Sequence, residues 1–151
     1  MTKTTSARAK PTASPEPRPR RRTKAAAESG SAPSTGLPPE LTLSARVAYE
    51  KKAAGVVVLD LRKAQAFTDY FFICTGQNAR QVKAIADAID TALANEGHKP
   101  AHVEGYDRAN WILLDYFTFI VHVFAPDARE FYDIERLWGS AGRVEMPDPA
   151  A

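Results

Sequence analysis

The clearest alternation of apolar and polar positions in the chain begins just after Gly76. Apolar side chains recur there at i, i+3, i+4, i+7 and i+11, which is the spacing of one helix face; they are Val82, Ile85, Ala86, Ile89 and Leu93. Asn78 and Gln81 have the spacing of a capping box, and Gly97 stands where a left-handed residue would end the helix. The pattern predicts an amphipathic helix with a defined start and end.

Short runs rich in β-branched and aromatic residues predict five strands. They cover residues 56–61, 69–75, 101–106, 111–116 and 118–124. The first run, VVVLDL, is nearly all apolar, as expected for a strand buried on both faces. The corner between the last two strands, Asp115 to Thr118, lacks the usual glycine, and its geometry stays open.

A helix is also predicted before the first strand, from Leu41 to Ala54. Thr42 or Ser44 would be its N-cap, and Gly55 stands just past its end. The segment between these signals contains good helix formers such as Ala and Leu. The first strand therefore follows a helix directly.

A third helix is predicted to begin at Pro126, because a first helical turn does not need the N–H that proline lacks, and to stop at Gly139. Its apolar positions fall at i, i+3 and i+7; they are Phe131, Ile134 and Trp138. Past Val144 the chain is rich in proline and alanine and is expected to fray.

These elements follow one another as αβ–βα–βββ–α, over about 100 residues, which is enough for one core. The sequence predicts an α/β (α+β) fold in which a single mixed β-sheet is flanked by helices. This domain would occupy residues 41–144, with a frayed C-terminus over 145–151.

Residues 1–40 differ from the remainder in composition. They hold seven of the eleven prolines, no aromatic residue, and eight basic against three acidic side chains. That leaves 12 of the 20 basic and 15 of the 18 acidic residues for 41–151, so the formal charge of +2 combines +5 in this tail with −3 in the body. So few apolar groups cannot offset the entropy of ordering the backbone, and a disordered, basic, proline-rich tail is predicted.

The tail permits more than one interpretation. Its RPRRR run, Arg18 to Arg22, is suited to RNA phosphates, whereas basic proline-rich tails also serve only to solubilise. An Arg- and Ser-rich, acid-poor leader is typical of organelle transit peptides, although the prolines disfavour the amphipathic helix of such a leader. No apolar run reaches a membrane span, no secretory signal is present, and Cys74 has no disulfide partner, which favours the cytoplasm.

The turn TGQNAR at Gly76 joins a strand to a helix, which is where many α/β proteins bind phosphates. It has one glycine instead of the three of a dinucleotide fingerprint, and it lacks the Gly-Lys-Ser/Thr of a P-loop. Arg80 and the helix N-terminus would attract an anion, but Asn78 and Gln81 are placed to occupy the free N–H groups. The sequence favours a capped turn over a nucleotide site.

Catalytic and metal-binding candidates are few. Asp60, Asp69 and Asp115 stand at strand ends and would serve a two-metal transferase only if they converged. The alternating Asp pair of such enzymes is missing, because Arg62 occupies the second position. His98, His102 and His122 lack partners at helical spacing, and His122 is interpreted as a hydrogen-bonded sheet residue. No catalytic group, metal or cofactor is expected.

The unusual feature of the body is its aromatic residues, interleaved with acids and arginines; they are Trp111, Tyr116, Phe117, Phe119, Tyr132 and Trp138. Core packing is the first interpretation of each. However, aromatics beside arginine at a sheet surface are also the anchors of protein interfaces. Trp111, which opens its strand after the polar DRAN loop, is the residue most readily placed on a surface.

Six strings in order resemble the bacterial ribosomal silencing factor (Iojap-like) family across about Leu43 to Val144. They are FTDYFFICTG, RQVKAIAD, HVEGY, WILLDY, VHVF and REFYDIERLWG. The resemblance implies a nucleotidyltransferase-like fold without the active site, and a cytoplasmic, non-enzymatic, homodimeric factor of the starved or stationary cell. Members bind the large ribosomal subunit at its protein numbered fourteen, on the intersubunit face, and sterically block joining with the small subunit.

The same resemblance implies a partner-binding surface. Its candidate residues are Trp111, Thr68, Asp69, Tyr70, Arg80, Asp115, Arg129, Tyr132, Glu135 and Trp138. Phe117 and Thr118 depart from the Gly-Asp that the family usually carries at the hairpin, and the basic tail lies outside the family pattern. The alternative function is a Mg²⁺-dependent nucleotidyltransferase-like enzyme, which would require the three aspartates to meet in an open cleft.

Overall fold

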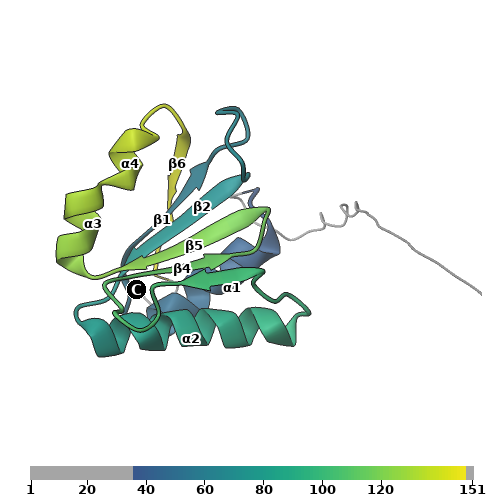
Figure 1. Cartoon of the computed structure of the whole chain (residues 1–151). Helices are drawn as coiled ribbons and strands as arrows, with labels where there is room; N and C mark the ends of the chain where they lie inside the picture. Colours follow the sequence, from purple (N-terminus) through teal and green to yellow (C-terminus); the bar gives the residue numbers. More distant parts are fainter. Residues whose placement is uncertain (1–35, 149–151) are drawn as a thin grey trace, which may run out of the picture. The chain divides into compact units, whose positions relative to one another are not determined.

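A computed structural model describes residues 36–148, and these form one mixed sheet with helices on both faces (Figure 1). The strands are β1 (Ala54–Asp60), β2 (Tyr70–Thr75), β3 (His102–Glu104), β4 (Trp111–Asp115), β5 (Phe119–Phe124) and β6 (Gly142–Glu145). The helices are α1 (Pro39–Glu50), α2 (Ala79–Asn95), α3 (Pro126–Tyr132) and α4 (Ile134–Leu137). The single mixed sheet flanked by helices confirms the predicted fold class.

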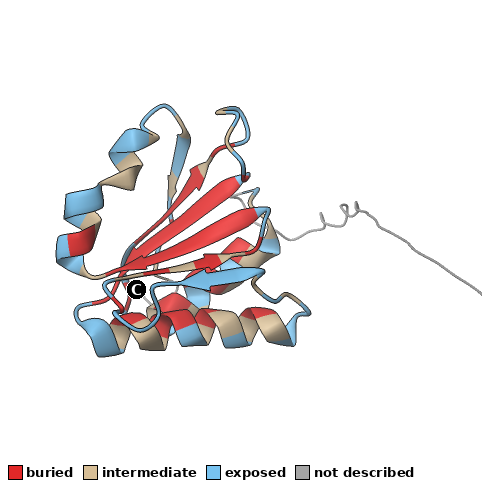
Figure 2. Ribbon diagram, viewed as in Figure 1, coloured by how far each residue is buried: buried red, intermediate tan, exposed pale blue. Residues whose placement is uncertain are grey.

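The strand order across the sheet is β3-β4-β5-β2-β1-β6. β2 and β5 lie parallel in the middle, and all other neighbouring pairs are antiparallel. Every residue of β2 and β5 is buried, as expected of central strands with both faces covered (Figure 2). The sheet therefore has two separate apolar faces, each with its own cluster of side chains.

The first face is covered by α1 and α2. Alternate residues of β2, such as Phe72 and Cys74, point into this cluster together with the predicted apolar face of α2. Burial raises the pKa of the Cys74 thiol to about 12, so the thiol stays protonated and unreactive at neutral pH.

The turn after Gly76 is a capped helix start, as the sequence favours. The Asn78 side-chain Oδ1 accepts from the Gln81 N–H at 2.9 Å, and Gln81 Oε1 accepts from the Gln77 N–H at 2.7 Å. Gly76 is required by space, because a Cβ there would lie 2.9 Å from the backbone nitrogen of Val82. The polar groups of this turn are thus used by the protein itself.

The predicted helix from Pro126 to Gly139 is wrong in its continuity. It breaks at Asp133, whose φ of 45° is left-handed, into α3 and the one-turn α4. Phe131, expected on the same apolar face as Ile134 and Trp138, is instead 79% exposed, while the other two pack on the second face of the sheet. Asp is one of the few residues that tolerates this conformation at low cost.

The ends of the fold also differ from the sequence prediction. α1 begins at Pro39 and ends at Glu50, with Thr42 and Ser44 inside the helix; the Ser44 hydroxyl donates to the Glu40 carbonyl. Gly55 lies within β1. The strand β6 was missed: where fraying was expected past Val144, pairing with β1 continues to Glu145, and Met146 is buried.

The predicted tail falls outside the described residues up to position 35. Between residues 36 and 148, no helix has both the length and the apolar character needed to cross a membrane.

The β4–β5 turn carries a residue with unfavourable backbone geometry. Phe117 has a φ of 72°, and the Thr118 N–H donates to the Tyr116 carbonyl at 2.9 Å, which makes Phe117 the centre of a γ-turn of the rare positive-φ kind. The turn is held by the Asp115 carboxylate, which accepts from the Phe117 N–H, and by the Thr68 hydroxyl, which donates to the Phe117 carbonyl. The Phe117 side chain is 71% exposed, so it contributes little burial in return.

We expect Phe117→Gly to stabilise the fold by roughly 0.5–1 kcal/mol. Glycine removes about 1–2 kcal/mol of left-handed strain, while its greater freedom in the unfolded chain offsets about 0.5–1 kcal/mol of that gain. Urea unfolding of both proteins measures the difference. A loss of stability in the variant would show that the phenyl ring makes a compensating contact.

Candidate functional site

Six rings follow one another along the second face of the sheet, and we call them the aromatic stripe. In order they are Phe67, Phe71, His122, Trp111, Tyr132 and Phe131. The centroids of successive rings lie 6.5, 4.5, 5.9, 4.6 and 5.0 Å apart. The rings come from the loop before β2, from three neighbouring strands and from α3, so only the folded sheet brings them together.

Strand alternation sets the direction of the stripe. In β4, Ile112 and Leu114 are buried against α2, whereas Trp111, Leu113 and Asp115 are only half-buried on the opposite face. The antiparallel register puts Trp111 opposite Phe124 of β5, and their rings stack at 5.0 Å. Trp111 is thus held in place while part of its surface stays accessible.

A buried hydrogen bond fixes the orientation of Trp111. Its indole Nε1–H donates to Nδ1 of His122 at 3.0 Å, which requires the His122 proton to sit on Nε2. That Nε2 is buried and has no hydrogen-bond partner among the residues described. Burial lowers the pKa of His122 to about 3, so the imidazole is neutral and accepts the indole proton at physiological pH.

The loop before Trp111 also depends on one glycine. Gly105 has a φ of 79°, and a Cβ at this position would lie 2.0 Å from the Trp111 carbonyl oxygen. No side chain fits there without moving the loop between β3 and β4. Gly105 therefore lets this loop close tightly against the start of β4.

Exposure along the stripe is highest at its ends. Phe67 is 78%, Phe131 79% and Tyr132 46% exposed, whereas Phe71 and His122 are buried. Leu137 on α4 is exposed as well. Exposed aromatic groups next to a rigid, half-buried tryptophan have the anatomy of a protein-binding surface.

Arg129 and Glu135 form a mostly buried ion pair, which we call the clamp. The guanidinium donates from Nη1 to the Gly55 carbonyl and the Thr75 hydroxyl, both at 2.8 Å, and from Nη2 to Glu135 at 2.7 Å. Glu135 Oε2 also forms an ion pair with Arg143 Nη1 at 3.3 Å. Burial raises the pKa of Glu135, but the hydrogen bonds and charges of the two arginines outweigh it, and the pKa is lowered overall.

The break at Asp133 makes this clamp possible. Residues six apart on a continuous helix point in different directions, since six steps of about 100° end some 240° away. With the left-handed residue between them, Arg129 and Glu135 meet, and each side chain is only 18% exposed. The clamp ties α3 and α4 to β1 and β2.

The other candidate residues are spread over the molecule. Trp138 meets Phe71 edge to face at 6.0 Å, beside the stripe. Thr68 and Asp115 support the β4–β5 turn, and Asp69 makes backbone bonds with Leu61 and Thr118. Tyr70 is buried among the side chains of the opposite face, and the exposed Arg80 lies on α2.

The structure thus brings Trp111, Tyr132 and Trp138 together and separates them from Tyr70 and Arg80. Phe67 and Phe131, the most exposed rings of the stripe, are not among the predicted site residues. Phe131 was assigned to an apolar helix face because its spacing fits a continuous helix. Phe67 stands in a connection that has no periodicity, so only its apolar character signals it.

The three strand-end aspartates do not converge. Asp60 on β1 and Asp115 on β4 have β2 and β5 between them, and three strand spacings of about 4.8 Å put them roughly 14 Å apart, well beyond a two-metal site. Within residues 36–148, no group of three His, Cys, Asp or Glu side chains is arranged to hold a metal ion. Nothing in this arrangement favours the alternative transferase.

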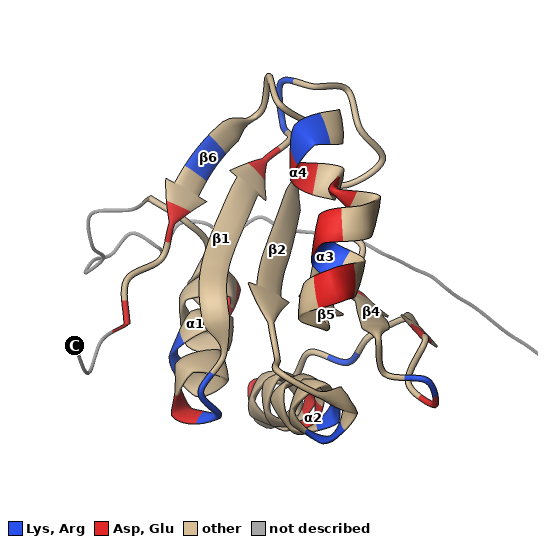
Figure 3. Cartoon of the chain, turned by 90° about the vertical axis from the view of Figure 1, so that its left-hand side faces the viewer, with Lys and Arg blue, Asp and Glu red and all other residues tan. Residues whose placement is uncertain are grey.

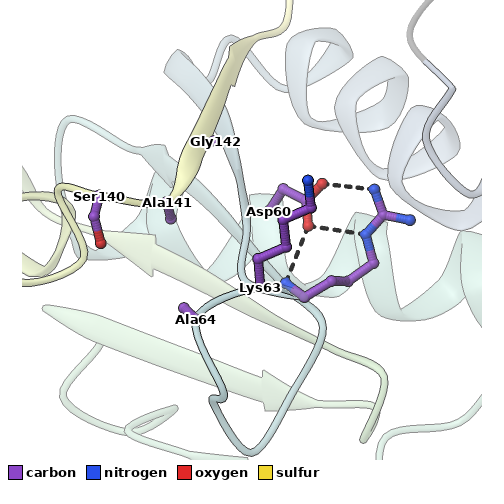
Figure 4. A pocket seen from close by; sticks show the side chains of 7 residues that line it. Asp60, Lys63, Ala64, Ser140, Ala141 and Gly142 are labelled. Carbon is purple, nitrogen blue, oxygen red and sulfur yellow. Dashed lines mark hydrogen bonds and ion pairs between the residues drawn. The ribbon is translucent and has the colours of Figure 1, made fainter.

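Asp60 has a local partner instead. Arg62 donates to its carboxylate from Nε at 2.9 Å and from Nη2 at 2.7 Å, and these hydrogen bonds lower the pKa of Asp60 (Figure 4). The pair borders a hollow of about 280 Å³, whose other lining residues are Lys63, Ala64, Ser140, Ala141 and Gly142. The negative charge of the Asp60 carboxylate is therefore balanced by Arg62 where both residues border this hollow.

Acidic residues accompany the exposed end of the stripe. Asp127 and Glu130 are exposed on α3, on either side of the clamp residue Arg129 (Figure 3). An apolar surface with acidic groups at its border suits a partner that presents apolar groups flanked by cations.

Comparisons with known proteins agree on one family. The model of the family described as "Ribosomal silencing factor during starvation" matches residues 35–151. The ribosomal silencing factor RsfS of Halalkalibacterium halodurans is 38% identical over 106 residues, covering 70% of this chain and 91% of that protein.

A crystal structure of a Chromobacterium violaceum protein superimposes with a TM-score of 0.65 at 30% identity, over 75% of this chain and 91% of that one. A more distant mouse relative, named "Mitochondrial assembly of ribosomal large subunit protein 1", is 26% identical over 92 residues, covering 59% of this chain and 40% of the mouse protein.

We predict that acid weakens the fold through His122. The folded pKa of about 3 lies below the unfolded value of about 6.5, so the unfolded chain binds a proton that the folded chain excludes, and stability falls as pH drops below 6.5. Between pH 6.5 and 5.0 this group should account for about 1.6 kcal/mol. Urea unfolding of wild type and His122→Gln at both pH values isolates the contribution, because other groups titrate in both proteins. Equal pH dependence would contradict the assignment.

We expect Arg129→Ala to lower the free energy of unfolding by about 2 kcal/mol. The substitution leaves Glu135, the Gly55 carbonyl and the Thr75 hydroxyl without a shared donor, at a partly exposed site where the full penalty of a buried pair does not apply. Arg136→Ala, an exposed arginine on α4 with no side-chain bond to another described residue, is the matched control and should change stability by less than about 0.5 kcal/mol. Equal effects would mean that the clamp contributes nothing.

Proposed function

This chain belongs to the ribosomal silencing factor family, and we propose that it binds the large ribosomal subunit and hinders joining of the small subunit, which represses translation in starvation or stationary phase. The contact would be made by the aromatic stripe and the neighbouring surface of α3 and α4. The observation that carries the proposal is the fixed, half-buried Trp111 between exposed rings.

The stripe has the properties of a binding surface rather than of an enzyme pocket. Trp111 is held by His122, Phe124 and Tyr132, so little side-chain freedom is lost when a partner covers it. Phe131 and Tyr132 add apolar area that water covers in the free protein. Preorganised aromatic anchors of this kind dominate the energy of protein interfaces.

Within the large subunit, the proposed partner is the protein numbered fourteen, at the intersubunit face. The family resemblance supports this choice, and the acidic residues of α3 suit a partner with cations around its contact surface. The mouse relative, whose name refers to assembly of the mitochondrial large ribosomal subunit, is in keeping with a large-subunit partner.

The inhibition would be steric. A domain seated on a surface that both subunits need excludes the other subunit for as long as it stays bound. Since occupancy must compete with subunit association, an affinity in the nanomolar range, about −12 kcal/mol, is expected. No chemical step is required.

The remaining parts of the proposal concern the protein outside the ribosome. We propose a cytoplasmic factor that forms a homodimer when free. The basic residues 18–22 are proposed to add contacts with ribosomal RNA, because a run of arginines gains affinity by releasing counterions from phosphates.

Trp111→Ala should raise the Kd for large subunits by about 30-fold, which corresponds to about 2 kcal/mol for an interface anchor. The measurement is co-sedimentation of the full chain with purified subunits, together with the amount of joined ribosome that remains. Wild type should travel with the large subunit and reduce the joined particle, and the variant should need a concentration about 30-fold higher to do either.

A matched pair of exposed rings separates loss of binding from loss of folding. Phe131→Ala removes a ring that is 79% exposed in the stripe, and Phe117→Ala removes one that is 71% exposed at the β4–β5 turn. We expect only Phe131→Ala to weaken binding. Weakening by Phe117→Ala alone would move the contact surface to the β4–β5 turn and contradict the proposal.

A further inference from the structure

A second surface feature lies on the other side of the loop that precedes Trp111. It is an open cleft of about 520 Å³ against the first turns of α2. Its lining residues are Ala79, Arg80, Lys83, Ala84, Asp87 and Tyr106.

The cleft is lined by two cations, Arg80 and Lys83, and by one carboxylate, Asp87. Among residues 36–148, neither Arg80 nor Lys83 has an ion-pair partner within 4.0 Å. They stand three residues apart on α2, a spacing at which like charges face one another and repel. Residues 41–151 hold 15 acidic against 12 basic side chains. A shortage of acidic residues therefore does not explain why Arg80 and Lys83 have no ion-pair partner.

The aromatic wall of the cleft is held from both sides. The Tyr106 hydroxyl donates to Asp87 Oδ2 at 3.0 Å, and Lys83 Nζ lies 5.2 Å from the centroid of its ring. The one carboxylate in the cleft is therefore engaged by the hydroxyl, and the ring is kept in place beside the two cations. A fixed ring next to paired cations matches the chemistry of a nucleotide unit.

The backbone at the start of α2 is not the binding group. Asn78 and Gln81 already accept or supply the hydrogen bonds of the first turn. Any anion in the cleft would be bound by the side chains of Arg80 and Lys83.

We propose that this cleft binds the sugar–phosphate backbone of ribosomal RNA, while the aromatic stripe on the opposite face of the sheet makes the protein contact. The inference rests on the proposed function, because it places the cleft against the large subunit. The loop between β3 and β4 runs from one surface to the other around the edge of the sheet: Tyr106 lines the cleft against α2, and Trp111 belongs to the stripe five residues later. Arg80 and Lys83 supply charge, and Tyr106 supplies a ring on which a base stacks.

The test compares two double variants of the full chain, both with the tail intact. R80Q/K83Q removes the cations of the cleft. R46Q/K99Q removes two exposed cations outside the cleft, one on α1 and one just after α2. The net charge changes by the same amount in both double variants. The Kd for large subunits is measured over a series of KCl concentrations at constant Mg²⁺.

We expect R80Q/K83Q to bind about tenfold more weakly at low salt and its salt dependence to be shallower, by about 1.4–1.8 in the slope of log K against log[salt], for two lost phosphate contacts. R46Q/K99Q should match wild type. If the two double variants have the same Kd and the same slope, the proposal is overturned.

Isolated protein fourteen, without RNA, distinguishes an RNA contact from a protein contact. R80Q/K83Q should bind it as wild type does, while Trp111→Ala should not. If R80Q/K83Q also loses affinity for the isolated protein, the cations contact protein and the RNA assignment is wrong.

A third arm decides the matter if wild type fails to bind subunits, which would refute the proposed function. Fluorescence anisotropy with a labelled 20-nucleotide single-stranded RNA at low salt then compares the same double variants. Weaker binding by R80Q/K83Q than by R46Q/K99Q supports the cleft on its own, and equal binding overturns it.

Discussion

The second face of the sheet is only partly covered, and much of the molecule is organised around that fact. α1 and α2 bury the first face over β1, β2, β4 and β5, whereas α3 and the one-turn α4 are too short to span the other. Arg129 holds these short helices in place, because its guanidinium on α3 donates hydrogen bonds to residues of β1, β2 and α4. The area left open beside α3 is where the half-buried face of β4 and the aromatic stripe meet solvent.

An uncovered face must avoid nonspecific association and still bind its partner. Here the central ring is held in place: Trp111 is oriented by a neutral, buried His122 and stacked on Phe124. Rigidity limits the entropy lost on binding, and the exposed acids Asp127 and Glu130 limit the contiguous apolar surface. These properties favour a binding role, and they do not favour a two-metal site, because Asp60 on β1 and Asp115 on β4 have two strands between them.

Local signals in the sequence were sufficient for most of the fold and for part of the site. The α2 helix, its cap and five strands follow from spacing and residue type, because α2 and the strands β1, β2, β4 and β5 bury regular apolar faces, while the exposed β3 is indicated by residue type alone. The break at Asp133 does not, because it is stabilised by Arg129 meeting groups on distant strands. The polar strand β6 is ordered chiefly by pairing with β1, which leaves no periodic signal. The family resemblance names Arg129 and Glu135 as partner-binding candidates, and the hydrogen bonds that they make within the fold could not be predicted from it.

Hydroxyl-radical footprinting of the full chain, alone and bound to large ribosomal subunits, tests the central claim most directly. It reports which side chains a partner covers without altering any of them. Phe67, Phe131 and Tyr132 are exposed in the free protein and should be protected from hydroxyl radicals in the complex, while the exposed Phe117 should keep its reactivity. Unchanged reactivity of the stripe in a saturated complex would contradict the account, because the contact would then lie on another face.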